Sequence, residues 1–260
     1  MEAPKALRLQ VRLARSGLAS RRRCEKFIAE GRIRVNGRIV RSRGAKVLPE
    51  DDVLFDGRSV KMEKRKVYIA LHKPRGFLCS DEDPDGRPLA KSLLGPVFKE
   101  RVFHVGRLDY MTSGLIFYTN DGNFARVLTH PSCEVEKEYL VGTKDVIPPA
   151  LLERFMRGMR IDGIHYKAYR AELISPRTAR VVLREGKNRE LRRVFLSMNI
   201  AIKKVQRIRI GPVRLKGIAS GHFRELHGGE IRMLMNRSDS RRSGEDGPSR
   251  PRRDDNGCRH

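Results

Sequence analysis

One short segment of the chain combines an isolated carboxylate with the residues of a tight turn. Residues 106–114 read Gly-Arg-Leu-Asp-Tyr-Met-Thr-Ser-Gly, and the apolar run 115–119 follows directly. This order predicts that Asp109 lies on a loop entering a buried strand, where a carboxylate is costly unless it is paired or used. A used carboxylate would act as a nucleophile or as a base. Composition alone favours the other interpretation, in which Asp109 caps backbone amides in a turn.

The sequence also contains a large excess of basic residues. The chain has 56 Lys and Arg against 31 Asp and Glu, a net charge of +25. The interval 8–46 holds 13 of the bases and two of the acids, which places +11 of the charge in one small segment. Three arginines open a predicted helix there, where cations oppose the helix dipole and call for an anion. A phosphate-binding face is therefore favoured over a solvated basic helix. We expect this face to contact nucleic acid through Arg21, Arg22, Arg23, Lys26, Arg34 and Arg38.

The elements that position these bases form a first domain over residues 7–66. Residues 8–17 have helical spacing and end at a glycine, and Ser20 is placed to cap a second helix over residues 21–30. The Asn36-Gly37 turn between two β-branched runs predicts a hairpin over residues 33–40. Two helices and a hairpin make a compact unit.

The elements around Asp109 belong to a second domain, residues 67–235. Strands are predicted at 68–71, 114–119, 139–141, 179–183 and 205–210, and helices at 124–128, 150–157 and 189–197. Strands outnumber helices without regular alternation, so the predicted fold class is α+β with a mixed, largely antiparallel sheet. Residues 236–260 are Arg, Ser, Asp, Gly and Pro with almost no apolar residue, which predicts a disordered basic-polar tail.

Composition also excludes several classes of protein. With 39% hydrophobic residues the chain can bury a core, but no stretch is apolar enough to span a bilayer and the start lacks a signal-peptide core. We therefore expect a cytoplasmic protein without a membrane partner. The four cysteines are far apart and have no histidine at ligand spacing, so we expect reduced thiols and no metal site. No nucleotide-binding loop or zinc-protease motif is present. His104, although close to Asp109, is expected to be structural.

The segment LARSGLASRRRCEKFIAEGRIRVNGRIV resembles the small RNA-binding module first named for a ribosomal small-subunit protein. That module recognises structured RNA by shape and backbone, and it occurs both in ribosomal proteins and appended to enzymes. The resemblance implies an RNA partner but not a reaction.

Longer stretches resemble the RsuA/RluB-like family of ribosomal RNA pseudouridine synthases. HVGRLDYMTSGLIFYTNDG is similar to the family's signature, and other blocks match in order. YIALHKPRGFLCS resembles its Lys-Pro-x-Gly block, VEKEYLVGT its Lys-x-Tyr block, REGKNRELRRVF its Arg-bearing block, and IGPVRLKGIASGHFREL its closing Gly-x-x-Arg-x-Leu segment. The resemblance extends from about residue 8 to 231, and several ordered motifs are more specific than any single one.

The resemblance implies roles for three residues in breaking the uracil–ribose bond, turning the base and rejoining it through carbon five. Asp109 would start the reaction by attacking the anomeric carbon or by removing a proton from the neighbouring sugar carbon, and both alternatives stay open. Arg192 would hold Asp109 charged and oriented. Tyr139 would stack on the flipped uracil, with a role at the carbon-five proton left open. The structural alternatives are a core tyrosine and an exposed helical arginine.

Further basic residues are expected at the substrate. Arg107 would fill the gap left when the uridine leaves its helix, or form a structural salt bridge. Lys187, Arg189 and Arg193 surround Arg192 and are expected to hold phosphates or to form a solvated face.

The isomerisation transfers nothing from a donor, so we expect no cofactor and a monomeric enzyme acting on ribosomal RNA or a ribosomal subunit precursor. A large-subunit target is favoured over a small-subunit one, because the segment GKNRELRRVF and the tail resemble the large-subunit branch of the family. Two other classes remain: a non-catalytic ribosome-assembly or chaperone factor, against which the ordered motifs argue, and an RNA methyltransferase, for which no methyl-donor pocket is evident.

Deleting residues 1–66 should weaken RNA binding and site selection more than the chemical step, because the basic module is separate from Asp109. The affinity of the full chain should fall steeply with salt. Equal affinity and an equal salt slope for the truncated and full chains, measured on one RNA fragment, would assign the binding elsewhere.

Overall fold

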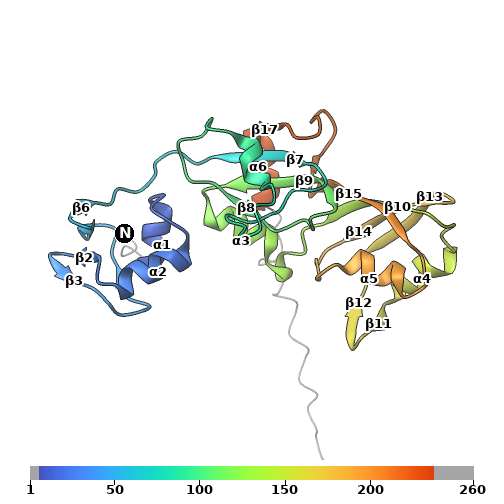
Figure 1. Cartoon of the computed structure of the whole chain (residues 1–260), viewed down its shortest axis with the longest axis horizontal. Coiled ribbons are helices and arrows are strands. Elements are labelled where there is room, and N and C mark those ends of the chain that lie inside the picture. The colour runs from blue at the N-terminus through green and yellow to red at the C-terminus, as the bar shows by residue number, and fades with distance from the viewer. Residues whose placement is uncertain (1–5, 237–260) are drawn as a thin grey trace, which may run out of the picture.

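The computed structural model describes residues 6–236, and a small N-terminal unit is followed by a large sheet (Figure 1). The small unit contains two short sheets, β3-β2-β5-β6 and β1-β4, packed with two helices. Its core consists of Leu9, Leu13, Cys24, Ile28, Ile33, Val47 and Val53 with Ala19. Its elements are β1 (Leu7–Arg8), α1 (Leu9–Arg15), α2 (Arg21–Ala29), β2 (Ile33–Val35), β3 (Arg38–Ile39), β4 (Lys46–Val47), β5 (Val53–Phe55) and β6 (Arg58–Ser59).

Local signals account for most of the small unit. The Ser20 side chain accepts a hydrogen bond from the backbone N–H of Arg23 and so caps α2. Asn36 and Gly37 have φ values of 49° and 79°, as a tight hairpin turn requires. The first helix begins one residue later than expected, because Arg8 pairs with Lys46 in a strand.

Arg12, on α1, is buried despite lying in the basic run. Its guanidinium donates to the backbone oxygens of Leu48, Pro49 and Asp51. One of the 13 bases therefore ties the first helix to the loop before β5, and contributes to folding rather than to an exposed basic surface.

The second unit is built on a nine-stranded sheet with the main order β13-β14-β10-β15-β9-β7-β17, while β16 pairs with β15 and β8 with β9. The pairings are antiparallel except for β9 with β15, so the expected mixed, largely antiparallel α+β class is confirmed. The strands are β7 (Tyr68–Lys73), β8 (Phe103–Val105), β9 (Thr112–Thr119), β10 (Lys137–Thr143), β13 (Arg170–Ser175), β14 (Thr178–Leu183), β15 (Ile202–Ile210), β16 (Val213–Arg214) and β17 (Phe223–Glu225), and a separate hairpin contains β11 (Met159–Ile161) and β12 (Ile164–Tyr166).

Helices cover both faces of this sheet, so all eight residues of β9 are buried. Leu115 and Phe117 face one core together with α3 (Gly122–Thr129) and α6 (Gly228–Asn236). Ile116 and Tyr118 face the other core, which includes α4 (Pro149–Arg157) and α5 (Glu190–Leu196). Short 3-10 helices span Ala90–Leu94 and Pro131–Cys133. Asn236, expected to begin the tail, is instead the last residue of α6; the rest of that expected tail, 237–260, lies outside the described residues.

Gly114, on β9, lies where two backbones approach closely. Gly114 lies opposite Arg207 in the parallel pairing of β9 with β15, and its φ is 115°. A Cβ atom placed there would lie 2.2 Å from the backbone oxygen of Arg207. Only glycine fits this position, because both the backbone conformation and the space exclude a side chain.

Gly114→Ala should lower the free energy of unfolding of the sheet domain by about 3 kcal/mol or more, because strain and overpacking add. Gly122→Ala is the matched control: Gly122 opens α3 with nothing within 4 Å of the added Cβ, and a gain of about 0.5 kcal/mol is expected. Urea denaturation followed by circular dichroism measures both. Similar stabilities for the two variants would show that the β9–β15 contact relaxes freely.

Candidate active site

The loop between β8 and β9 holds Asp109 at the surface while its neighbour is buried. Leu108 is 6% exposed and packs into the core below, and its N–H donates to Sγ of Cys79. The backbone oxygen of Asp109 accepts from the N–H of Thr112 at 3.0 Å, which closes the turn into β9. The carboxylate itself is 42% exposed. The backbone therefore presents this carboxylate outward from a fixed turn.

Lys73, at the end of β7, forms hydrogen bonds to backbone groups in and near the same loop. Its side chain is completely buried, and Nζ donates to the backbone oxygens of Pro74 and Phe77 at 2.8 Å and of Tyr110 at 3.4 Å. Burial lowers the pKa of Lys73 to about 8, and the charge of Asp109 partly opposes this shift. Lys73 belongs to the Lys-Pro-x-Gly block, but its burial beneath Asp109 was not anticipated.

Tyr139 lies on β10 beside a register shift. The pairing with β15 changes between Glu138 and Tyr139, so that Tyr139 faces Arg207 across the sheet. Such bulges re-aim side chains and are frequent near active sites. Tyr139 is 8% exposed, and its hydroxyl receives a hydrogen bond from Nη1 of Arg207 at 3.5 Å.

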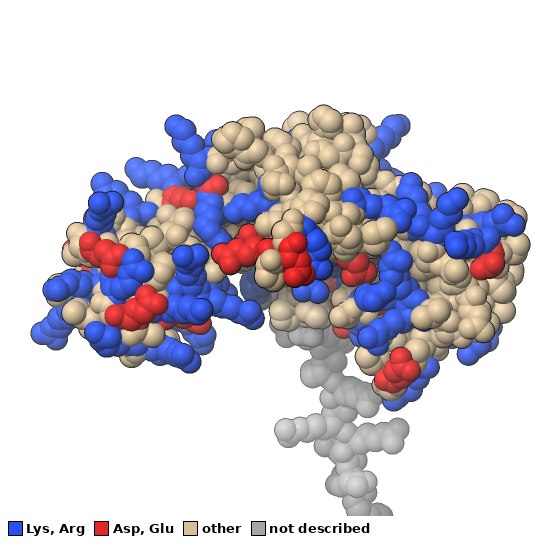
Figure 2. Space-filling model, viewed as in Figure 1, with Lys and Arg blue, Asp and Glu red and all other residues tan. Residues whose placement is uncertain are grey.

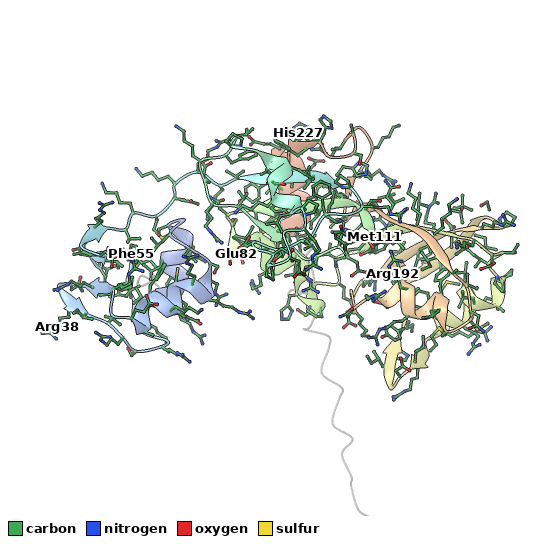
Figure 3. The ribbon with its side chains drawn as sticks, viewed as in Figure 1. Arg38, Phe55, Glu82, Met111, Arg192 and His227 are labelled. Atoms are coloured by element: carbon green, nitrogen blue, oxygen red, sulfur yellow. The ribbon has the colours of Figure 1, made fainter. Side chains whose placement is uncertain are left out.

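Arg192 reaches the Asp109 loop from α5, and Figure 3 shows it beside Met111. Nη2 donates to the backbone oxygen of Met111 at 3.2 Å, and Nε lies 3.9 Å from Oδ2 of Asp109. Burial lowers the pKa of Arg192, while the charge of Asp109 opposes that shift. A long, partly exposed ion pair stabilises the fold by at most about 1 kcal/mol, so its main effect is on orientation.

The three side chains line one cavity of about 90 Å³. Leu183, Leu191 and Val205 provide apolar walls, and Thr112 adds a hydroxyl. A cavity with apolar side chains in part of its wall and a carboxylate, a phenol and a guanidinium in the rest is suited to a flat polar ring beside a bond to be broken. His104 does not line this cavity; its Nδ1 lies 2.8 Å from the backbone oxygen of Gly106.

Comparison with known proteins identifies the family of this fold and cavity. Residues 67–197 match the family model for RNA pseudouridylate synthase, and residues 7–53 match that for the S4 domain. The chain belongs to the RNA pseudouridylate synthase family. The family expected from the sequence is thereby confirmed, and the protein is a pseudouridine synthase with an N-terminal S4 domain.

Individual relatives agree with this assignment. A Borreliella burgdorferi protein named as an uncharacterized RNA pseudouridine synthase is 42% identical, over 91% of this chain and 96% of its own length. The ribosomal large subunit pseudouridine synthase B of Bacillus subtilis is 36% identical, over 87% and 95%. A crystal structure of a pseudouridylate synthase superposes with a TM-score of 0.66 and 26% identity, covering 88% of this chain and 99% of the other.

The basic residues expected at the RNA divide into separate groups in this pseudouridine synthase. Arg107, Lys187 and Arg189 line the Asp109 cavity. Arg193 does not, since it turns to the hydroxyl of Tyr166 at 3.5 Å. Lys187 donates to the backbone oxygen of His165 and pairs with Glu185 at 3.1 Å.

The basic residues expected in the S4 domain lie on α2 and on the β2–β3 hairpin. Arg21, Arg22 and Arg23 are exposed at the start of α2, where Arg23 lies 3.7 Å from Glu82 of the sheet domain. Figure 3 places Arg38 at the outer tip of the hairpin. Figure 2 shows Lys and Arg side chains over much of the visible face of the S4 domain, with acidic side chains among them. That all six expected residues contact RNA stays a prediction.

Other expectations concern the thiols and the membrane. Cys24, Cys79 and Cys133 are free, and burial raises the pKa of Cys24 to about 11; Cys258 lies outside the described residues. Within residues 6–236 no cluster of His, Cys, Asp or Glu is arranged to hold a metal ion. Over the same span, none of the helices combines the length and apolarity needed to cross a membrane.

Glu190 was overlooked at the sequence level because it stands among charged residues. The structure buries it at 5% exposure, where its carboxylate accepts from the N–H of Lys187 at 3.0 Å. Burial raises the pKa of Glu190 to about 7, against the lowering effect of that hydrogen bond. The loop that carries Lys187 and Arg189 is thus tied to a carboxyl group that titrates near neutrality.

Glu190→Gln should change how the free energy of unfolding depends on pH. A carboxyl whose pKa is raised on folding stabilises fully below its unfolded value, near 4.5, and this contribution is lost as pH rises through 7. The variant should match the wild type near pH 4.5 and exceed it by roughly 2 to 3 kcal/mol at pH 8. Urea denaturation at several pH values measures the difference. A difference between Glu190→Gln and wild type that does not change with pH would contradict the assigned burial.

Proposed function

We propose that this enzyme converts one uridine of large-subunit ribosomal RNA to pseudouridine, with Asp109 as the essential carboxylate. The observation that carries the proposal is that Asp109, Tyr139 and Arg192, from three separate elements, line one cavity with apolar walls. The printed name of the Bacillus subtilis relative supports a large-subunit target. The S4 domain supports recognition of structured RNA.

The chemistry requires the uridine to leave its helix, because the bond between uracil and ribose is otherwise out of reach. Arg107, exposed at the rim of the cavity, is suited to fill the vacated space. Tyr139 would stack on the flipped uracil, with its hydroxyl oriented by Arg207. Lys187 and Arg189 would hold the neighbouring phosphates at the rim.

Asp109 would begin the reaction either at the anomeric carbon or at the neighbouring sugar proton. Both routes release a uracil anion, which then bonds through carbon five and loses the proton held there. Atoms and electrons balance within the substrate, so the reaction consumes no cofactor. Arg192 would keep the Asp109 carboxylate ionised and aimed at the sugar. We propose that the enzyme acts in the cytoplasm, where ribosomal subunits are available to it.

Asp109→Asn should abolish pseudouridine formation, by roughly 10³-fold or more, because an amide is neither a nucleophile nor a base. RNA affinity should stay within about threefold of wild type, since the amide preserves size and removes only a charge that repels phosphate. The assay incubates ribosomal RNA with each protein and no added cofactor, maps pseudouridine and measures affinity.

The matched pair Arg192→Gln and Arg193→Gln controls for charge on α5. Both remove one cation, but only Arg192 lines the cavity. We expect a loss of about 10- to 100-fold in turnover for Arg192→Gln and little change for Arg193→Gln. Near-normal turnover by Asp109→Asn would remove the central claim, and turnover lost only together with folding or binding would make Asp109 structural.

A further inference from the structure

A second cavity, of about 210 Å³, adjoins the first, and the two share Arg107, Tyr139 and Gly186 in their walls. It lies between the β8–β9 side of the sheet, the end of α3 and strands β10 and β15. Lys137 and Arg207 also line it, from neighbouring strands. The mechanism above leaves this space unused.

Arg207 brings an incompletely bonded cation to this cavity. Arg207 is 3% exposed, and its Nε donates to the backbone oxygen of Leu115 at 2.7 Å. Nη1 makes the long contact with Tyr139, and Nη2 is buried with no hydrogen-bond partner. Among the described residues no carboxylate lies within ion-pair distance of Arg207. A buried N–H without a partner costs about 1 to 3 kcal/mol, more on a charged group.

Lys137 adds a second cation to the same wall. Nζ donates to the backbone oxygens of Val135 at 2.9 Å and Arg184 at 3.4 Å, and the residues described include no carboxylate paired with it. Burial, and then the charge of Arg207, lower the pKa of Lys137 to about 8. The buried Arg207 and the half-buried Lys137 therefore place two cations that repel each other in one cavity.

The nearby acids are already paired elsewhere. Glu136 and Glu138 bind Arg209, and Glu185, which also lines the cavity, binds Lys187. Arg184 in the wall is similarly occupied, with Glu134 at 3.2 Å and the Tyr169 ring 3.5 Å below its guanidinium. Burying cations without a counter-charge is unfavourable, so the arrangement is suited to an anion that arrives from outside.

We propose that this cavity binds a phosphodiester group of the RNA strand adjacent to the target uridine, held by Arg207 and Lys137 with Arg107 at the rim. The inference rests on the proposed function, because the shared wall at Tyr139 and Arg107 places the cavity next to the site assigned to the uridine. Nη2 of Arg207 is the donor left for a phosphate oxygen. Binding there would also draw Arg207 and Tyr139 into one fixed arrangement before the chemical step.

The first arm of the test uses the RNA and the wild-type chain. A short RNA containing the modified uridine, identified by pseudouridine mapping, is prepared with one flanking phosphate at a time replaced by a neutral methylphosphonate. At the position whose phosphate enters the cavity, the affinity of the wild-type chain for the RNA should fall about tenfold, as expected for the loss of charge-assisted hydrogen bonds.

The second arm couples that RNA change to the protein. In Lys137→Gln the same methylphosphonate should cost less than threefold, because the cation it would have met is already absent. Lys204→Gln removes an exposed charge from β15, the strand of Arg207, and should retain the wild-type tenfold effect. Equal methylphosphonate losses in Lys137→Gln and wild type at every flanking position would overturn the proposal.

Inorganic phosphate, followed by ³¹P line broadening with the full chain, tests the cavity independently of any reaction. Wild type and Lys204→Gln should broaden the signal alike, and Lys137→Gln at least threefold less. If that difference appears without coupling to any methylphosphonate, the site takes a free anion and the RNA assignment is wrong. If no uridine is converted, the proposed function fails, and an absence of Lys137-dependent phosphate binding would then overturn the anion site as well.

Discussion

The parallel contact between β9 and β15 is the constraint on which the rest of the catalytic domain depends. It joins an antiparallel group formed by β7, β8, β9 and β17 to a second group formed by β10, β13, β14, β15 and β16. The two strands meet over three residue pairs, with Gly114 against the backbone of Arg207. Asp109 precedes β9, Arg192 precedes β15, and Tyr139 lies on the strand next to β15. A shift at this junction would therefore displace all three side chains together.

Burial of charge is the second theme of the domain. Lys73, Arg207 and Glu190 are each at most 5% exposed, and each is attached to a segment bordering the cavity. Lys73 ties the Asp109 loop through backbone oxygens, and Glu190 ties the loop before α5. Hydrogen bonds to backbone groups let a buried charge position a loop without a partner of opposite sign. Such groups hold the site in shape, while the exposed cations around it remain available to RNA.

The net charge of +25 does not act as one continuous surface. Arg12 is used within the S4 domain, Arg193 turns to Tyr166, and Arg23 lies beside Glu82. Charge density in the sequence consequently overstates the number of cations facing one ligand. It still indicates the class of partner correctly, because phosphate attraction depends on the summed field as well as on individual contacts.

The sequence by itself determined the local elements, the fold class and the family. The Asn36-Gly37 turn, the Ser20 cap and the strand around residues 114–119 each follow from short-range propensities that need no distant partner. Ordered motifs identified the family, and they predict Asp109, Tyr139 and Arg192 as site residues. Only the tertiary structure decided which charges are buried. Arg207 in an otherwise strand-like run, and Glu190 within a charged run, look like solvated residues until strands and helices from distant parts of the chain enclose them. Burial depends on packing between such segments, so the residues that flank a charge in the sequence do not determine whether it is buried.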